Sequence, residues 1–374
     1  MLKSTFERTK QYYLRIALLA IPLLSLQELA EAQGCVAIRS TGAVCMKPQA
    51  GIESGWQVNM IYRYFRSFRH FVGTEEQKER LENHTEVINW QHTLDLSLVR
   101  TFNSRWSLSF NVPVLANTRS SMYEHYGNGS KSPNARQQTH SFGIGDIRFA
   151  VYRWLLDPAK SRKGNIQAGL GLKLPTGDYQ FQDYFVKNDS TRVLGPVDQS
   201  IQLGDGGTGF TTELNGYYNF SHRFSVYGSF YYLFNPREQN GVSTARGGAV
   251  SASAVQYGTA VMSVPDQYMV RLGANYVLQH LTLSGGGRME CVPAKDLIGG
   301  SGGFRRPGYV ISVEPGLSYT FKKLVFFSTV PVALQRNRTQ SYGDKLQTQA
   351  TGVYKQGDAA FADYSINIGM SVRL

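Results

Sequence analysis

Few residues in this chain of 374 have the type and spacing that catalysis requires. His92 lies in an alternating segment, where a histidine followed two positions later by a serine could supply the base and nucleophile of a lipid-facing hydrolase. The residue two positions after His92 is Leu94, and the neighbouring run from Trp106 offers only apolar side chains on that face. We therefore expect His92 to be a packed or interfacial histidine. We predict that the chain is not an enzyme, with no catalytic residue and no cofactor.

The segment from Thr176 to Gly209 is rich in acidic side chains that could ligate calcium. It contains the following aspartates among glycines: Asp178, Asp183, Asp189, Asp198 and Asp205. Their spacing fits no EF-hand loop, so we expect solvated turn aspartates and no metal site.

Three cysteines allow more than one interpretation: Cys35, Cys45 and Cys291. In an oxidising compartment Cys35 and Cys45 could form a disulfide that closes a short loop and leaves Cys291 unpaired. Acylation of Cys35 in a lipoprotein is the alternative, although Ala32-Gln33-Gly34 is a poor match to that signal.

Charged residues also recur singly on the polar face of alternating segments, and a soluble core would not bury them. These candidates for the lining of a polar lumen are Arg63, Asp95, Asp146, Arg148, Lys173, Glu213, Arg271, Arg288, Glu290, Glu314 and Asp363. Five are basic and six are acidic. Because mixed signs pair across an interior, we expect a narrow lumen braced by ion pairs.

The segments that carry these residues alternate with a period of two, as strands with two unlike faces do. From Val87 to Val99 the apolar residues, among them Leu96, share one face and the polar residues share the other. Twelve such runs start near Trp56, Val87, Trp106, Thr139, Asn165, Phe210, Phe224, Gln267, Leu281, Gly308, Leu324 and Phe361.

The connections between the runs alternate between short and long. Long connections lie near residues 69 to 86, 119 to 138, 176 to 209, 235 to 266, 291 to 307 and 336 to 360. This alternation is typical of a barrel with tight periplasmic turns and long outer loops. We predict an all-β fold: a closed antiparallel up-and-down transmembrane β-barrel of about twelve strands over residues 56 to 374, in the bacterial outer membrane.

Prolines test this prediction, because a central strand tolerates proline poorly. Pro113 and Pro331 are expected to mark bulges at the barrel rim, and Pro315 a bulge beside the lumen.

The N-terminus has the pattern of a secretory signal. Basic residues precede an apolar run from Ile16 to Leu26, and Ala30-Glu31-Ala32 follows as a cleavage site. We predict a signal peptide over residues 1 to 32 and a periplasmic N-terminal segment over residues 33 to 55.

The formal net charge is +12, but its Lys and Arg residues are scattered, with no basic patch interleaved with aromatics. Nucleic acid is therefore not expected as a partner. The expected partners are outer-membrane lipid, the barrel-assembly machinery and a small-molecule solute, although the chain ends in Leu374 where many barrels end in an aromatic residue.

Two segments resemble the meta-pathway phenol-degradation family of outer-membrane transporter-like barrels. They are Gly143-Ile144-Gly145-Asp146-Ile147-Arg148 and Gly169 to Asp178, with its Leu174-Pro175-Thr176-Gly177, followed by Leu203 to Phe210. The match covers about residues 140 to 235. The resemblance implies a membrane barrel that handles small hydrophobic or aromatic compounds.

The leading hypothesis is a barrel that passes or binds a small molecule through a narrow charged lumen gated by long outer loops. The alternative is a nonconducting structural or adhesion barrel that acts through its loops at 176 to 209 and 235 to 266.

Overall fold

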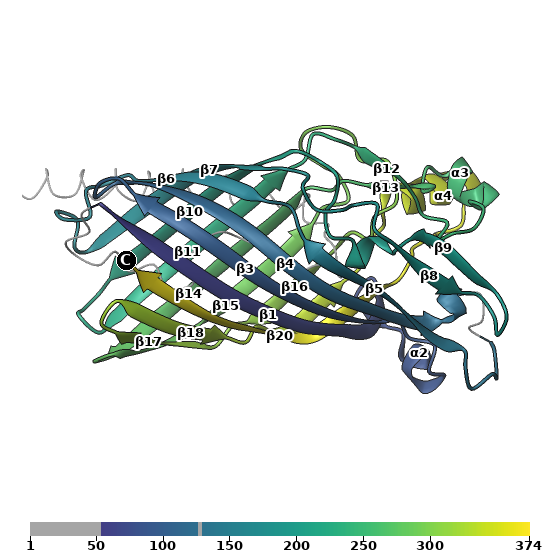
Figure 1. Ribbon diagram of the computed structural model, residues 1–374, viewed down its shortest axis with the longest axis horizontal. Helices are drawn as coiled ribbons and strands as arrows, with labels where there is room; N and C mark the ends of the chain where they lie inside the picture. The colour runs from purple at the N-terminus through teal and green to yellow at the C-terminus, as the bar shows by residue number, and fades with distance from the viewer. Residues whose placement is uncertain (1–53, 126–128) are drawn as a thin grey trace, which may run out of the picture.

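The computed structural model describes residues 54–125 and 129–374, and the fold of this part is one closed antiparallel β-barrel (Figure 1). Twelve strands cross the barrel wall, in agreement with the predicted fold class. Nine of them are continuous: β1 (Gly55–Val72), β3 (Ile88–Thr101), β4 (Trp106–Met122), β7 (Gly164–Lys173), β10 (Gly209–Asn219), β11 (Phe224–Phe234), β14 (Gln267–Leu278), β15 (Leu281–Val292) and β20 (Ala359–Arg373).

The other three crossings are each split into two strands by a short interruption. They are β5 (Arg136–Ile144) with β6 (Arg148–Trp154), β16 (Gly308–Val313) with β17 (Gly316–Phe321), and β18 (Leu324–Thr329) with β19 (Val332–Asn337). Each crossing pairs with its neighbours along the chain, and β20 pairs with β1 from Gln57↔Arg373 to Phe71↔Ala359, which closes the barrel.

Alternation in the sequence becomes alternation of exposure. On β20, Asn367 is 4% exposed and Ile368 is 53% exposed, and the same two-residue period holds on β3. Successive side chains of a strand point to opposite faces, so polar residues face inward and apolar residues face outward. Exposed apolar side chains such as Leu98, Leu170 and Leu272 therefore form the outer wall.

Short turns lie at one end of the barrel and long connections at the other (Figure 1). The short turns join β3 to β4, β6 to β7, β10 to β11, β14 to β15, and β17 to β18, and the C-terminus lies at the same end. In outer-membrane barrels the short turns are periplasmic and the longer loops extracellular. With the apolar outer wall, this arrangement places the protein in the outer membrane.

Each proline lacks a backbone N–H donor and so removes a hydrogen bond from the pairing of its strand. Pro315 separates β16 from β17 beside the buried Glu314, as expected. Pro331 separates β18 from β19 in the middle of their crossing and not at the rim, where a bulge was expected. Pro113 behaves differently from the expectation: β4 stays continuous through it, and the interruption lies in the neighbouring crossing, where Gly145 N–H donates to the Pro113 carbonyl (2.8 Å).

Two predicted loop boundaries are corrected by the structure. β1 continues to Val72 and β4 to Met122, past the loop starts expected at residues 69 and 119. The alternation of exposure is lost at these outer ends, where His70 and Phe71 of β1 are buried in succession, as are residues 119 to 121 of β4.

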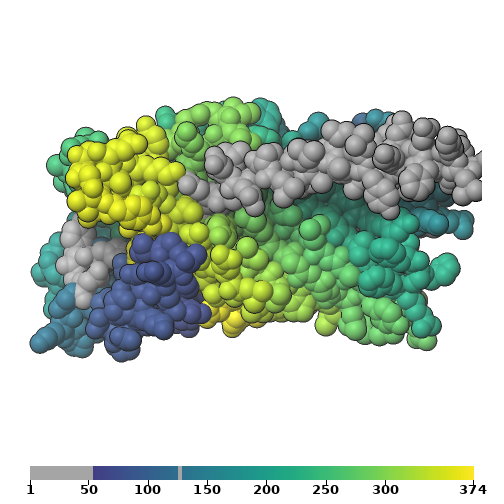
Figure 2. Space-filling model, turned by 180° about the vertical axis from the view of Figure 1, so that it is seen from behind, coloured from purple at the N-terminus to yellow at the C-terminus, as the bar shows by residue number. Residues whose placement is uncertain are grey.

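Small elements cover the extracellular end. They are β2 (Glu75–Glu76), α2 (Lys78–Glu82), η1 (Tyr123–His125), β8 (Gln182–Val186), β9 (Arg192–Pro196), η2 (Gln199–Ile201), β12 (Gln239–Ser243), α3 (Ala252–Gln256), β13 (Val261–Ser263) and α4 (Tyr342–Thr351). Figure 2 shows α2 in purple beside the yellow segment around α4. Arg80 of α2 and His70 of β1 both contact Asp358, which follows α4 (2.7 Å each), and so join the two regions.

Within the described residues, no helix has the length and apolar character needed to cross a membrane. The predicted signal peptide, most of the predicted periplasmic segment, Cys35 and Cys45 lie outside the described residues, and these assignments stay predictions.

Candidate functional site

Nine of the eleven charged residues predicted to line the lumen are buried. Glu290 and Asp363 are half-buried. Two contacts join buried side chains of strands that are not paired with each other: Arg148 of β6 donates to the Tyr231 hydroxyl of β11 (3.1 Å), and the Tyr152 hydroxyl of β6 donates to Glu213 of β10 (3.0 Å). In the sheet, β7 and β10 separate the first pair and β7 alone separates the second, so both contacts run over the inner face of neighbouring strands.

Glu314 is the centre of one group of ion pairs. Its carboxylate lies 2.7 Å from Arg271 Nε and 3.4 Å from Arg288 Nη1, and Arg288 Nη2 lies 2.6 Å from Glu290. Glu314 occupies the interruption between β16 and β17, where the chain leaves regular pairing beside Pro315. The mixed charges thus pair with one another at this interruption.

Two further predicted lumen residues interact with residues of other wall strands. Arg63 Nε of β1 donates to the Asn367 side chain of β20 (3.0 Å), and Asp95 of β3 interacts electrostatically with Arg148.

Asp363 belongs to a separate group near the extracellular rim. Arg69 Nη1 lies 2.9 Å and Arg336 Nη2 lies 2.6 Å from its carboxylate, and Arg69 also pairs with Glu76 (2.5 Å). β19 and β20 share one paired position, Val332↔Tyr364, so the Arg336 side chain, which also donates to the Ala362 carbonyl (3.1 Å), helps to join them.

The connection between β7 and β10, residues 174 to 208, folds into the barrel. Gln91 of β3 donates to the Ser200 carbonyl (2.8 Å), and Asn117 of β4 and Ser141 of β5 donate to the Ile201 carbonyl. Val197 and Ile201 are fully buried. We call residues 174 to 208 the inward loop, because its central turn is held against the inner wall and crosses the lumen.

The two motifs that carry the family resemblance meet at the base of the inward loop. Asp146, in the interruption between β5 and β6, accepts hydrogen bonds from the backbone N–H of Gly177 (3.0 Å) and of Asp205 (3.2 Å). Lys173 pairs with Asp146 (3.6 Å) and with Asp205. Thr176 completes the junction, since its hydroxyl donates to the Gly145 carbonyl (3.0 Å). Asp146 and Lys173 therefore hold both ends of the inward loop.

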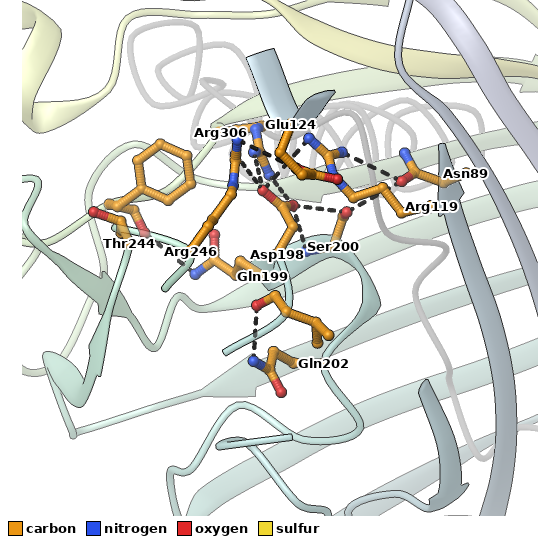
Figure 3. A network of polar contacts seen from close by, with 12 residues as sticks. Asn89, Arg119, Glu124, Asp198, Gln199, Ser200, Gln202, Thr244, Arg246 and Arg306 are labelled. Atoms are coloured by element: carbon orange, nitrogen blue, oxygen red, sulfur yellow. Dashed lines mark hydrogen bonds and ion pairs between the residues drawn. The ribbon is translucent and has the colours of Figure 1, made fainter. Parts of the chain in front are cut away.

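Asp198 anchors the middle of the inward loop (Figure 3). Its carboxylate pairs with Arg306 (2.7 Å), Arg246 (2.6 Å) and Arg119 (3.7 Å), which come from three separate segments of the chain. Glu124 adds a second carboxylate beside Arg119 (3.9 Å) and Arg246 (3.7 Å). We call these five residues the Asp198 cluster.

Charge fixes the ionisation of this cluster. Burial alone would raise the pKa of the Asp198 carboxyl, but the three arginines outweigh burial and hold that pKa well below its usual range. Asp198 also accepts from Ser200 N–H (3.0 Å) and hydroxyl (2.8 Å), which orients the turn. The cluster ties the inward loop to wall strand β4 and to two other extracellular connections.

A cavity of about 100 Å³ lies between the inward loop and the wall. Its apolar lining includes Phe65, Leu115, Leu203 and Met262. Its charged lining consists of Arg63, Arg148, Lys173, Arg306, Asp146 and Asp205. Its mixed lining matches the chemistry of a small molecule with both apolar and polar parts.

Sequence reasoning missed Asp198, Arg119, Arg246 and Arg306. Alternation continued from Asn111 would have placed Arg119 on the inner face, but the strand was expected to end before it. Asp198 was expected to be a solvated turn aspartate, and its exposure is only 2%. No local pattern marks it, because its partners lie 79, 48 and 108 positions away in the chain.

The other candidates for chemistry lie apart from one another. Among residues 54–125 and 129–374, no three His, Cys, Asp or Glu side chains gather as metal ligands. His92 packs against Tyr64 and contacts the Tyr62 hydroxyl through Nδ1 (2.7 Å), as a packed histidine does. Cys291 is buried on β15 and forms no disulfide within the described part of the chain.

Searches with family models and against curated proteins find no match. Among solved structures, the outer membrane channel from Pseudomonas putida F1 is similar at a TM-score of 0.57 and 12% identity, over 89% of this chain and 100% of that one. The Pseudomonas putida toluene transporter TodX is similar at a TM-score of 0.43 and 9% identity, over 85% and 89%. The first likeness supports the outer-membrane barrel fold, and the phenol-degradation resemblance stays a prediction.

Proposed function

We propose that this barrel passes a small molecule across the outer membrane, with the inward loop as its gate. The observation that carries the proposal is the anchoring of residues 174 to 208 across the lumen, at Asp146 and Lys173 at the base and at Asp198 in the middle. A barrel that served only as a platform for extracellular loops has no need to fold a loop inward and fasten it to three wall strands.

The conformation described here corresponds to the closed gate. The cavity beneath the inward loop has a volume of only about 100 Å³, well below the roughly 300–1,000 Å³ of ordinary ligand sites. Passage of a solute therefore requires the middle of the loop to leave the wall, which means separating Asp198 from its arginines. The base at Asp146 can stay in place as the hinge of that movement.

The solute we propose is small and partly apolar and carries a polar or anionic group. Phe65, Leu115 and Met262 offer contacts to a hydrocarbon or aromatic ring. The guanidinium groups of Arg63 and Arg148, on the same cavity, attract anions and hydrogen-bond acceptors. This class includes the aromatic compounds that the sequence resemblance implies. The proposal places the charged lumen residues along the path of the solute.

Single-channel recording of the refolded barrel tests the proposal. We compare the wild-type chain with a variant in which residues 180 to 202 are replaced by a short Gly/Ser linker. The proposal predicts small or brief openings for the wild type, a larger steady conductance for the loop variant, and reduction of that current by millimolar benzoate. A silent membrane with both proteins would instead support the nonconducting platform.

Benzoate is matched with glucose at the same concentration as a neutral polar control. Benzoate should reduce the current more strongly than glucose if apolar and cationic groups of the lumen act together. Equal effects of the two solutes would contradict the proposed solute class while leaving the gate itself supported. We propose no catalytic role, and we expect the refolded barrel to turn over neither phospholipid nor ester.

A further inference from the structure

A groove lies at the periplasmic rim, far from the inward loop. It is formed by the turn between β6 and β7 together with the periplasmic end of β10, and its volume is about 810 Å³. The turn is the longest of the five periplasmic turns. The groove is independent of the proposed gate, because none of its lining residues belongs to the cavity under the inward loop.

The floor of the groove is apolar and open to the membrane. Leu155, Leu156, Ile166 and Tyr218 line it, and each is about half exposed. Ile166 and Tyr218 sit at the start of β7 and the end of β10, on the outward face that meets lipid. An apolar surface at the periplasmic end of the lipid-facing wall contacts the acyl chains of the periplasmic leaflet.

The edge of the groove is cationic. Lys160, Arg162 and Lys163 lie within four positions, line the groove and are exposed. The nearby Asp157 is the one acidic residue of the turn, and its carboxylate accepts from Ala159 N–H (3.1 Å), so three cations stand against one negative charge. Three cations at the rim of an apolar groove match a lipid that has an anionic head group and hydrocarbon chains.

The turn is fixed in place. Asn219 of β10 donates to the Arg162 carbonyl through its side chain (2.8 Å) and to the Lys163 carbonyl through its backbone (2.6 Å). Asn165 and Leu156 exchange two hydrogen bonds, from Leu156 N–H to Asn165 Oδ1 (3.0 Å) and from Asn165 Nδ2 to the Leu156 carbonyl (2.9 Å). A turn held by four bonds presents its cations in a constant position, which lowers the entropic cost of binding.

We propose that this groove binds an anionic phospholipid of the periplasmic leaflet, of the phosphatidylglycerol class. The phosphate lies against Lys160, Arg162 and Lys163, and an acyl chain lies along Leu156, Ile166 and Tyr218. Lysines and arginines scattered at membrane interfaces attract anionic lipids without selecting one, and the apolar groove beside the cations is what adds a bound position.

Native mass spectrometry of the refolded barrel tests this. The protein is incubated in micelles with equal amounts of dioleoyl phosphatidylglycerol and dioleoyl phosphatidylethanolamine. We expect the wild type to retain one phosphatidylglycerol in preference to phosphatidylethanolamine. The variant K160Q/R162Q/K163Q should lose this retention by about one to two orders of magnitude, because each cation near an anionic surface contributes about fivefold.

The matched control is R223Q/K322Q/K323Q, which removes the same charge from exposed residues of two other periplasmic turns. It should retain phosphatidylglycerol as the wild type does. A second variant, L156S/I166S, keeps the cations and should also lose retention. Heat-modifiable migration on a detergent gel confirms that every variant has folded before its lipid is measured.

The proposal is overturned by any of four results. These are equal retention of both lipids by the wild type, unchanged retention by K160Q/R162Q/K163Q, an equal loss by the control variant, and preferential retention of lipid A over phosphatidylglycerol when both are offered. Unchanged retention by L156S/I166S would show that head-group charge suffices and would remove the groove from the site.

Discussion

Arg306 and Asp198 form a two-pronged ion pair, with Nη1 2.9 Å from Oδ1 and Nη2 2.7 Å from Oδ2. The two residues lie 108 positions apart, one in the connection before β16 and the other in the inward loop. Parallel N–H···O bonds between a guanidinium and a carboxylate fix both direction and distance. This pair therefore sets where the inward loop rests in the lumen.

Asp198→Asn should open the gate. Asparagine keeps the size of the side chain but removes the charge that Arg119, Arg246 and Arg306 share. Removal of one partner from a buried ion pair costs about 3–5 kcal/mol, because the remaining charges stay buried without compensation. We expect a larger mean conductance and faster proteolysis of the inward loop, with the barrel still folded by heat-modifiable migration.

Asp178→Asn is the control for that variant, since Asp178 is an exposed aspartate of the same loop that caps the Gln180 N–H (2.9 Å). Its conductance should equal that of the wild type. If both variants gained conductance equally, the effect would belong to loop charge in general rather than to the Asp198 cluster.

The gate should remain closed under mild acid. The pKa of Asp198 is held below that of an unfolded aspartate, about 3.9. The group therefore stabilises the closed loop fully above that pH, and the contribution is lost only as the pH falls through the lower folded pKa. Conductance recorded between about pH 8 and pH 4 should be constant and should rise in stronger acid. A midpoint near neutral pH would contradict this.

The fold was predictable because hydrocarbon restricts which arrangements of the backbone can cross a membrane. Strands can cross lipid only as a closed sheet without unpaired edges, so alternation along runs such as Val87 to Val99 and the order of short and long connections define the barrel. Pro315 and Pro331 even indicated two of the strand interruptions. The third, at Gly145, was not indicated, because it depends on how β5 and β6 meet Pro113 across the sheet.

The gate could not be predicted in the same way. Asp198 follows Pro196-Val197 in a stretch that looks like an ordinary polar loop, and the arginines that bind it come from a wall strand and two other loops. Contacts between distant segments depend on how the loops pack, and one sequence does not encode that packing in any local period. The lumen charges were easier, because strand parity alone assigns Arg271 and Arg288 to one face.

Gly204→Ala should loosen the base of the inward loop. A Cβ at this position would lie 2.5 Å from Asp146 Oδ1 and 2.7 Å from the Gly177 carbonyl, so the carboxylate or the backbone must shift. Overpacking of this kind costs about 1–3 kcal/mol. We expect greater hydrogen exchange of the Gly177 and Asp205 amides, which bond to Asp146. Gly287→Ala, where a Cβ meets nothing within 4 Å, should leave exchange of these amides unchanged.

Glu314→Gln should change both stability and ion selectivity. It removes the carboxylate that Arg271 and Arg288 share, leaving two buried guanidinium groups with less compensation. We expect a loss of about 3–5 kcal/mol in the free energy of unfolding and a reversal potential shifted towards anions in a salt gradient. Asp363→Asn, in the half-buried rim group, should have a smaller effect on stability. An unchanged reversal potential for Glu314→Gln would place this group outside the ion path.

Leu170→Arg tests the outward wall itself. Leu170 is 69% exposed on β7, six positions from the periplasmic start of that strand, and pairs with Val151 and Thr212 on its neighbours. A charge on the lipid face near the bilayer midplane costs about 2–4 kcal/mol, whereas the same charge near an interface costs about 0–1 kcal/mol. Leu156→Arg at the periplasmic rim is thus the matched control. Urea titrations of both variants refolded into lipid vesicles should show the larger loss for Leu170→Arg. If instead the two losses were equal, or if Leu170→Arg were neutral, Leu170 would not face hydrocarbon, and the inside and outside of the barrel would have to be exchanged.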